Sequence, residues 1–292
     1  MNPLLTAVAA ERAAGPRRPR RYLMCPPTFF TVRYRINPWM EPAAPVDTDR
    51  AVRQWRRLRD ELAGLGHTVE IMTPDPALPD LVFTANGGIV VGDRALVPRF
   101  RHPERQGESA VFAAAFRDLG VTHVEQASAV NEGEGDFLLV GETFLAGTGQ
   151  RSDPAAPAEV AEFFGIDVVP LTLVDPRFYH LDTALARLRP DLVAYWPGAF
   201  DERSNGVLRE LFPDAIRATE DDAAALALNM VSDGTSVIMA PGRAELAARI
   251  AERDLHVREL ATDELRKSGG GAKCCVLEWG VAPVSAGGGP PA

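Results

Sequence analysis

Cysteine is scarce in this chain, with three residues among 292, at positions 25, 274 and 275. Three cysteines, two of them adjacent, cannot build a disulfide framework, and no CxxC or Cys/His pair stands at zinc-binding spacing. This pattern is typical of a protein whose thiols stay reduced. We therefore expect a cytoplasmic protein without a structural zinc site.

Long hydrophobic runs and an excess of positive charge are also missing. No apolar stretch approaches the roughly 20 residues that span a bilayer, and residues 1–21 place their arginines after a short apolar stretch, the reverse of a secretory signal. There are 31 Lys and Arg residues against 40 Asp and Glu, a formal net charge of −9. We expect no membrane and no nucleic-acid partner, whereas a small cationic ligand is compatible with this charge.

The remaining composition is that of a globular protein, because 46% of the residues are hydrophobic and 24% are charged. Residues 1–20 are expected to form a flexible basic tail, and the Gly- and Pro-rich residues 281–292 a second flexible tail. No long linker divides residues 21–280, which predicts one domain. The sequence leaves open whether copies of this domain assemble into a homo-oligomer.

Two segments repeat one design, in which a strand, a short turn and a second strand precede a helix. Residues 88–98 form the first predicted hairpin, followed by a helical stretch at 103–119, and residues 137–147 and 157–164 repeat the design. Similar patterns predict strands at 22–25, 67–72, 192–196, 236–240 and 275–278, and helices at 47–65, 201–211, 223–230 and 243–254. Such repetition favours an α/β ring or propeller, with an ordinary doubly wound sheet as the open alternative.

The segment Gly269-Gly-Gly-Ala-Lys-Cys274-Cys275 is the most unusual in the chain, and an apolar run follows it. Three glycines let the backbone turn sharply and approach a ligand closely. A cysteine at the mouth of the following strand suits a nucleophile, because the thiolate is the reactive species. The alternative is a glycine turn that leads into a strand whose cysteines are small core residues.

A partner for this thiol is available in Tyr179-His180-Leu-Asp182-Thr. In extended chain His180 and Asp182 point to the same side, so an imidazole and a carboxylate could face one ligand. A capped helix start is the alternative. The other four histidines stand in ordinary amphipathic contexts.

Two further segments bear acids or amides beside glycines. In Glu132-Gly-Glu134-Gly-Asp136 three carboxylates crowd one turn, and they repel one another unless a cation or a proton relieves them. The spacing lacks the ligand pattern of an EF-hand calcium loop, and a solvated turn is the other alternative. Asp80 and Asn86 stand in the second segment, which ends in two glycines. Together the segments describe a nucleophile, an acid–base helper and a cation cradle.

These segments resemble, in this order, the motifs of the guanidine-modifying superfamily, which contains arginine deiminases, dimethylargininases and amidinotransferases. The matching motifs are FTAN at 83–86, EGEGD at 132–136, HLD at 180–182 and the Gly-rich segment that ends in Cys. The resemblance covers residues 22–277. It implies an α/β fold, namely a five-bladed α/β propeller of pseudo-repeated ββαβ units with the active site in its central channel.

The resemblance also implies catalytic roles. Cys274 matches the nucleophile, His180 the general acid/base and Glu132 the acid that grips the guanidinium. Glu134 stays a rival to Glu132, because the family's acid segment is usually one residue shorter. Asp182 matches the carboxylate that pairs with the guanidinium in the deiminases.

The remaining matches concern substrate binding. Arg105 and Arg151 match arginines that hold the substrate α-carboxylate, with a solvated basic pair as the alternative. Asp80 and Asn86 match two substrate-side positions, and many relatives carry Asp at the second. Asn37, in Asn37-Pro-Trp-Met, is expected on a lid or substrate-facing loop.

The implied activity is hydrolysis of the guanidine group of an arginine-type substrate through a covalent Cys thiouronium intermediate, with no metal or organic cofactor. Dimethylargininase activity, which gives citrulline and a methylamine, is the favoured expectation. The alternative is an arginine deiminase, or a dihydrolase that continues to ornithine, ammonia and carbon dioxide. An amidinotransferase needs a second amine site that the sequence does not reveal, and a non-catalytic ribosome-binding relative is expected to lack the Cys and the His.

Overall fold

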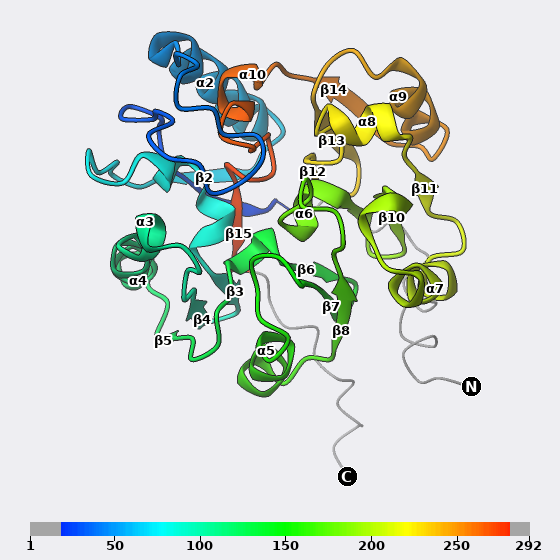
Figure 1. Ribbon diagram of the computed structural model, residues 1–292, viewed down its shortest axis with the longest axis horizontal. Coiled ribbons are helices and arrows are strands. Elements are labelled where there is room, and N and C mark those ends of the chain that lie inside the picture. The colour runs from blue at the N-terminus through cyan, green and yellow to red at the C-terminus, as the bar shows by residue number, and fades with distance from the viewer. Residues whose placement is uncertain (1–18, 281–292) are drawn as a thin grey trace.

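A computed structural model describes residues 19–280, so nearly all of the expected tails, at 1–20 and 281–292, lie outside the described residues. Within this range the strands form five three-stranded sheets, each with one antiparallel and one parallel pairing. Figure 1 shows the sheets around a common centre, with the longer helices at the outside. The protein is therefore a mixed α/β protein of small sheets, and a single doubly wound sheet is the wrong alternative.

Both predicted hairpins are present, and each begins a unit of strand, strand, helix and strand. The first unit comprises β3 (Ile89–Val91), β4 (Arg94–Val97), α3 (Pro103–Gln106), α4 (Glu108–Asp118) and β5 (His123–Gln126). The second comprises β6 (Phe137–Val140), β7 (Thr143–Thr148), α5 (Ala156–Phe164) and β8 (Val168–Thr172). In both units the hairpin strands are antiparallel and the strand after the helix is parallel to its neighbour.

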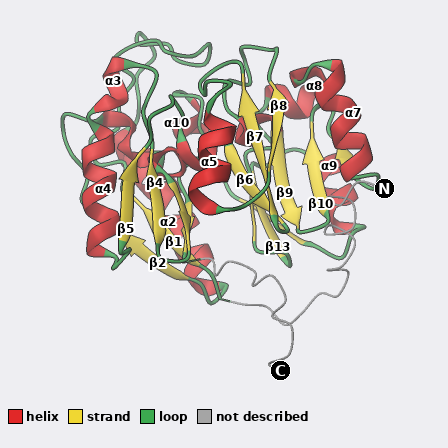
Figure 2. Cartoon of the chain, turned by 90° about the horizontal axis from the view of Figure 1, so that it is seen from below, coloured by secondary structure: helices red, strands yellow, loops and turns green. Residues whose placement is uncertain are grey.

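Two more units follow the same order. The third comprises β9 (Leu185–Arg189), β10 (Leu192–Tyr195), α7 (Glu202–Leu211) and β11 (Ile216–Arg217). The fourth comprises β12 (Val231–Ser232), β13 (Ser236–Met239), α9 (Ala244–Ala251) and β14 (His256–Glu259). Figure 2 shows α4 outside β4 and β5, and α7 on the opposite flank beside β10.

The fifth sheet joins the two ends of the described chain. It contains β15 (Leu277–Trp279), β1 (Arg21–Met24) and β2 (Thr68–Ile71), and α2 (Thr48–Gly64) connects β1 to β2. β15 pairs antiparallel with β1, with Arg21 opposite Trp279. The strand that closes this sheet thus comes directly after the Gly-rich segment.

α2 shows how the sequence pattern produces a packed helix. The side chain of Asp47 accepts a hydrogen bond from the backbone N–H of Arg50 at 2.9 Å and so caps the helix. Trp55, Leu58 and Leu62 recur at helical spacing and are buried. This face packs against α10 (Asp263–Arg266), which precedes the Gly-rich segment.

Three predicted elements differ from the structure. The helix predicted at 223–230 is wrong: α8 (Glu220–Ala224) begins earlier, at a capping box of Thr219 and Asp222, and the chain then turns through Leu226, whose φ is +54°. The stretch predicted at 103–119 is two helices that meet at Gly107. The last strand begins at Leu277 rather than at residue 275, because both cysteines lie in the turn before it.

Short segments precede the first strands of the five units. The 3-10 helices η1 (Pro79–Val82) and η2 (Thr84–Gly87) precede β3, η3 (Gly133–Gly135) precedes β6, and α6 (Leu181–Ala184) precedes β9. Asn229 stands just before β12, and Cys274 just before β15. Another 3-10 helix, η4 (Pro197–Ala199), lies after β10. Within residues 19–280 no helix is both long and apolar enough to cross a bilayer.

Candidate active site

The structure gathers all nine predicted site residues in one buried place. None of them is more than 7% exposed. A cavity of about 10 Å³ lies between them, lined by Asn37, Asp80, Asn86, Arg105, Arg151 and Cys274. Glu132, His180 and Asp182 join it through the hydrogen bonds described below. Six of the nine come from the segments before the first strands, whereas Asn37, Arg105 and Arg151 follow β1, β4 and β7. Residues distant in sequence share the site because these segments meet there.

The sulfur of Cys274 lies between an amide and a carboxylate. Asn229 Nδ2 donates a hydrogen bond to Sγ at 3.0 Å, and Sγ lies 3.3 Å from Asp182 Oδ2. Burial, together with the negative charge of Asp182, raises the pKa of the Cys274 thiol well above its ordinary value of 9.0. Cys274 is therefore a thiol that donates to a carboxylate.

Asp182 keeps one oxygen open. Oδ1 is buried and has no hydrogen-bond partner among the described residues. Burial raises the pKa of Asp182 to about 6, so the group is mostly ionised at neutral pH. A buried acceptor without a donor destabilises the site. A ligand that brings N–H groups and a positive charge satisfies this oxygen.

His180 and Glu132 form a tight pair. Nε2 of His180 lies 2.7 Å from Glu132 Oε2, and Arg151 Nη1 donates to the same oxygen at 2.7 Å. Burial favours the neutral acid, but Arg151 and the His180 hydrogen bond outweigh it and hold the pKa of Glu132 well below its usual value. Burial lowers the pKa of His180 to about 4, which keeps the imidazole neutral at pH 7.

The two rival acids point to different partners. Glu134 Oε2 accepts from Lys273 Nζ at 2.7 Å and from the backbone N–H of Glu278 at 3.1 Å, so it faces away from the imidazole. Glu132 is therefore the acid that contacts His180. A Cβ on Gly135, the residue after Glu134, would lie 2.2 Å from the Asn86 amide nitrogen, so this close approach requires glycine.

Both arginines that were expected to hold the substrate α-carboxylate are buried and paired with protein carboxylates. Arg105 bonds Glu108 through two nitrogens, Nε at 2.8 Å and Nη2 at 2.7 Å. Arg151 donates to Glu132 and, at 3.0 Å, to the carbonyl of Ile36. Each is 3% exposed, so the alternative of a solvated basic pair is wrong. Their contact with a substrate carboxylate stays a prediction.

Asp80 and Asn37 both contact the Gly-rich segment through Ser268. Asp80 Oδ1 accepts from the Ser268 hydroxyl at 3.1 Å, and Oδ2 accepts from the Tyr34 hydroxyl at 2.7 Å. Asn37 Nδ2 donates to the Ser268 carbonyl at 3.1 Å. Ile36, Asn37 and Met40 also line the cavity, and the expected role of this loop as a lid stays a prediction.

Asn229 and Glu108 escaped the sequence analysis. Asn229 Oδ1 accepts from the backbone N–H of Gly271 at 3.0 Å and of Cys274 at 3.1 Å, so one side chain holds both the loop and the sulfur. The sequence feature that could have indicated Asn229 is a single amide side chain within an apolar run. Glu108 lies four residues before Phe112 on the buried face of α4, and an acid on an apolar face was the available signal.

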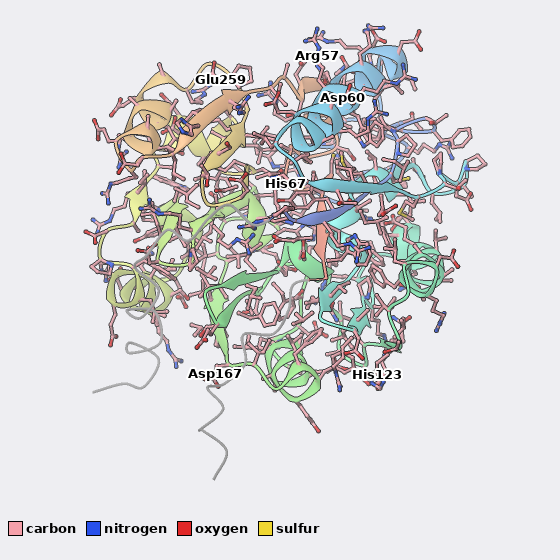
Figure 3. All side chains as sticks on the ribbon, turned by 180° about the vertical axis from the view of Figure 1, so that it is seen from behind. Arg57, Asp60, His67, His123, Asp167 and Glu259 are labelled. Carbon is pink, nitrogen blue, oxygen red and sulfur yellow. The ribbon has the colours of Figure 1, made fainter. Side chains whose placement is uncertain are left out.

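Two of the other histidines, His67 and His123, have their partners outside the site. His67, labelled in Figure 3, is buried and its Nε2 lies 3.1 Å from Asp233 Oδ2. His123 lies at the periphery in the same view, with about half of its side chain exposed (46%). Among residues 19–280, no three His, Cys, Asp or Glu side chains form a group that could hold a metal ion.

Comparison with known proteins gives a family and close relatives. The family model described as N,N dimethylarginine dimethylhydrolase, eukaryotic, matches residues 37–281. The N(G),N(G)-dimethylarginine dimethylaminohydrolase of Mycobacterium tuberculosis is 47% identical over 275 residues, which are 93% of this chain and 91% of the relative. The bifunctional arginine dihydrolase/ornithine cyclodeaminase ArgZ of Synechocystis is 39% identical over 263 residues, 88% of this chain and 37% of ArgZ.

Solved structures agree with this. The crystal structure of the N-terminal domain of ArgZ bound to product has a TM-score of 0.87 at 38% identity, over 90% of this chain and 100% of that domain. A dimethylarginine dimethylaminohydrolase adduct with a chloropyridine, 21% identical over 89% of this chain and 100% of that one, shares the fold with a TM-score of 0.73. The family match, the 47% identity and the buried Cys, His and carboxylates lead to one conclusion: the chain belongs to the dimethylarginine dimethylaminohydrolase family.

Proposed function

We propose that the protein is a dimethylargininase, which hydrolyses the guanidine group of an Nω-methylated arginine to citrulline and a methylamine. The observation that carries the proposal is Asp182, whose Oδ2 accepts from the Cys274 thiol at 3.3 Å while its buried Oδ1 has no partner among residues 19–280. One carboxylate is thus set to bind a flat cation directly beside a nucleophile. The family and the 47% identical relative support a hydrolase of guanidino C–N bonds.

The guanidinium of the substrate enters a site whose charges complement it. Its positive charge is delocalised over three nitrogens, which makes its carbon a poor electrophile. Asp182 and Glu132 fix its plane and stabilise the charge that localises as the carbon becomes tetrahedral. Each charge-assisted hydrogen bond to such a cation contributes about 1.5–3 kcal/mol. The bound cation also favours the Cys274 thiolate, since it offsets the negative charge of Asp182.

The sulfur then attacks the guanidine carbon and forms a C–S bond. The proton that the sulfur loses reaches the departing methylamine through Nδ1 of His180, the ring nitrogen that Glu132 leaves open. A covalent thiouronium remains. Nδ1 next takes a proton from water, and the hydroxide adds to the thiouronium carbon. The C–S bond then breaks, the hydroxyl proton passes to the departing sulfur to give citrulline and the thiol, and the proton on Nδ1 leaves to solvent. A crystal structure of an ArgZ N-terminal domain variant covalently bound to a reaction intermediate supports a covalent course.

The rest of the substrate is assigned to the cavity. We infer that Arg105 and Arg151 hold the α-carboxylate, with Asp80 and Asn86 on the substrate side. About 10 Å³ holds a single water molecule rather than an amino acid. Residues 36–40, with Asn37, therefore act as a lid that opens to admit substrate.

Arginine dihydrolase activity, giving ornithine and ammonia, is the second candidate. Two observations favour it: Asn86 stands where many superfamily relatives carry Asp, and ArgZ is 39% identical. The non-catalytic, ribosome-binding alternative is disfavoured because the Cys and the His are both present. An amidinotransferase stays the least favoured, since the sequence reveals no second amine site.

We also propose that residues 21–280 form one catalytic domain. In it the five sheets are the blades of a five-bladed propeller and the active site lies in the central channel. The repeated order of strand, strand, helix and strand supports this arrangement. A cytoplasmic location and assembly into a homo-oligomer complete the proposal; light scattering after gel filtration tests the latter.

One assay separates the candidates. The protein is incubated with arginine, monomethylarginine and asymmetric dimethylarginine, and citrulline, ornithine, ammonia and methylamines are measured. We expect citrulline and dimethylamine from the dimethylated substrate, with little turnover of arginine. Ornithine and ammonia from arginine would establish the dihydrolase instead. Cys274→Ser is the inactive control, and Cys275→Ser, buried in the core, keeps most of the activity.

A further inference from the structure

A fully buried ion pair lies beside the site without contacting the reacting atoms. Glu108 is 0% exposed and accepts from Nε and Nη2 of Arg105 at 2.8 and 2.7 Å. This two-bond fork fixes the plane of the guanidinium. Burying such a pair costs desolvation, and apolar residues of similar volume usually stabilise a fold as well or better. The pair therefore calls for an explanation other than stability.

The fork leaves Nη1 of Arg105 free to face Asn86, while Nη2 also donates to the Asp80 carbonyl at 3.4 Å. Arg105 Nη1 donates to Asn86 Oδ1 at 2.8 Å. Because guanidinium only donates, this contact decides which end of the amide is oxygen. The amide nitrogen must then face the other way, where it donates to the Glu132 carbonyl at 3.3 Å.

The same amide nitrogen lies 3.5 Å from Nδ1 of His180. An amide nitrogen is a donor, so it favours the imidazole tautomer in which Nδ1 carries no proton. The ring proton then stands on Nε2, which donates to Glu132 Oε2 at 2.7 Å. The hydrogen-bond chain runs from Glu108 through Arg105 and Asn86 to His180.

We propose that Glu108 is a positioning residue of the reaction: through this chain it holds His180 in the tautomer whose Nδ1 carries no proton, the form that can accept one. The proposal rests on the hydrolysis proposed above, in which Nδ1 carries the proton from sulfur to amine. The proposal also explains why Nε and Nη2 of Arg105 are bound to Glu108 and do not point into the site.

A measurement without substrate tests the tautomer directly. Nitrogen-15 NMR of the histidine rings at pH 7.5 reports which nitrogen is protonated, and His180→Gln identifies the signal. We expect the Nε2–H form in the wild type, and loss of that single form in Glu108→Gln and in Asn86→Ala. An unchanged His180 spectrum in Glu108→Gln overturns the proposal, whatever the substrate of the enzyme.

Kinetics test the route of the effect. Glu108→Gln is expected to lower kcat between about tenfold and a hundredfold, because misplaced groups cost that much in enzymes. In the Asn86→Ala background the same change should cost less than about twofold, since the chain is already broken. Effects that simply multiply would contradict the route through Asn86. Absence of all turnover in the wild type, with the NMR result intact, would instead refute the proposed function alone.

Two further variants guard against trivial loss of folding. Glu264→Gln removes a buried carboxylate outside the site, where it binds Lys267 and the Asp47 backbone, and it should leave kcat and the His180 spectrum unchanged. Should Glu108→Gln fail to fold, Arg105→Lys keeps the charge but loses the fork, and the same spectral change is expected from it.

Discussion

At the scale of single residues, Cys274 and Asp182 hold each other in the resting state. The negative charge of Asp182 raises the pKa of the thiol, after burial, and the hydrogen bond from the thiol opposes the rise in the pKa of Asp182. A thiol beside a carboxylate is therefore stable until a cation arrives. We therefore expect the thiolate to form mainly when a cationic substrate is bound.

The rate of alkylation of Cys274 tests the effect of Asp182 on the pKa of the thiol. We expect iodoacetamide to label Cys274 slowly at pH 8 in the wild type. In the Asp182→Asn variant Cys274 should be labelled faster, because removing the adjacent negative charge lowers the pKa of the thiol. Peptide mass spectrometry locates the label, and Cys274→Ser shows which peptide carries it. Equal or slower labelling of Asp182→Asn would contradict the role of Asp182 in raising this pKa.

At the scale of elements, the site depends on short segments that approach one another closely. η3 passes so near η2 that a Cβ on Gly135 would lie 2.2 Å from Asn86 Nδ2 and 3.3 Å from His180. Asn86 and His180 also contact each other, so a shift of either side chain changes the position of the imidazole relative to Asn86. The packing of two 3-10 segments thus sets the geometry of the acid–base pair.

Gly135→Ala tests this packing. The added methyl must displace Asn86 or His180, so we expect kcat to fall by about a hundredfold, the usual cost of a displacement near 1 Å. Gly206→Ala in α7 is the matched control, since its Cβ would meet only Arg209 Nη2, at 3.9 Å. It should keep full activity and gain up to about 1 kcal/mol of stability. Full activity in Gly135→Ala would show that the segment tolerates a Cβ.

At the scale of the whole molecule, the two ends of the described chain meet in one sheet, and Cys274 stands three residues before β15. The turn that contains Cys274 leads directly into β15, and β15 pairs with β1. Leu277 is fully buried and packs with Leu23 in one apolar cluster. The sheet that joins the two described ends and the placement of the Cys274 sulfur therefore depend on the same strand.

Leu277→Ala is expected to destabilise the protein by about 2–5 kcal/mol, because it removes buried methyl groups and leaves a cavity. Urea unfolding measures the change in the free energy of unfolding. We expect activity to be lost at urea concentrations well below the unfolding midpoint, because the Cys274 turn loosens first. Val174→Ala, at a side chain 51% exposed, should change stability by less than about 0.5 kcal/mol. If the variant loses stability but its folded fraction keeps full activity, the packing of Leu277 does not control the position of Cys274.

An ion-pair network also ties β15 to its neighbours. Glu278 accepts from Arg20 at 2.9 Å and is paired with Arg187 of β9. Burial opposes ionisation, but Arg187 and Arg20 lower the pKa of Glu278 from 4.5 to about 2. A depressed folded-state pKa stabilises the protein above the unfolded value, and this stability is lost as the pH falls through the folded value.

The resulting test compares wild type with Glu278→Gln between pH 7 and pH 2. The wild type should be more stable at pH 7, and the difference should shrink as the pH falls from about 4.5 towards 2. Denaturant midpoints at each pH supply the measurement. A difference independent of pH would mean that the charge of Glu278 contributes nothing to closure.

Much of the fold and of the candidate site is predictable from the sequence because the signals are local. Period-2 and helical patterns predict both hairpins and α2, and they fail at 223–230, where the chain turns so that Asn229 reaches the Cys274 loop. That failure is tertiary in origin: the contacts of Asn229 come from residues more than 40 positions away. Local patterns carry no information about such partners.

The sequence by itself determined which chemical groups are present and beside which glycines they stand, since residue type and spacing settle those. It could not choose between Glu132 and Glu134, which are separated by a single glycine. Only the tertiary structure decided this, because it turns one acid to His180 and the other to Lys273. It likewise showed Arg105 held by Glu108, since burial and pairing arise when distant segments pack together.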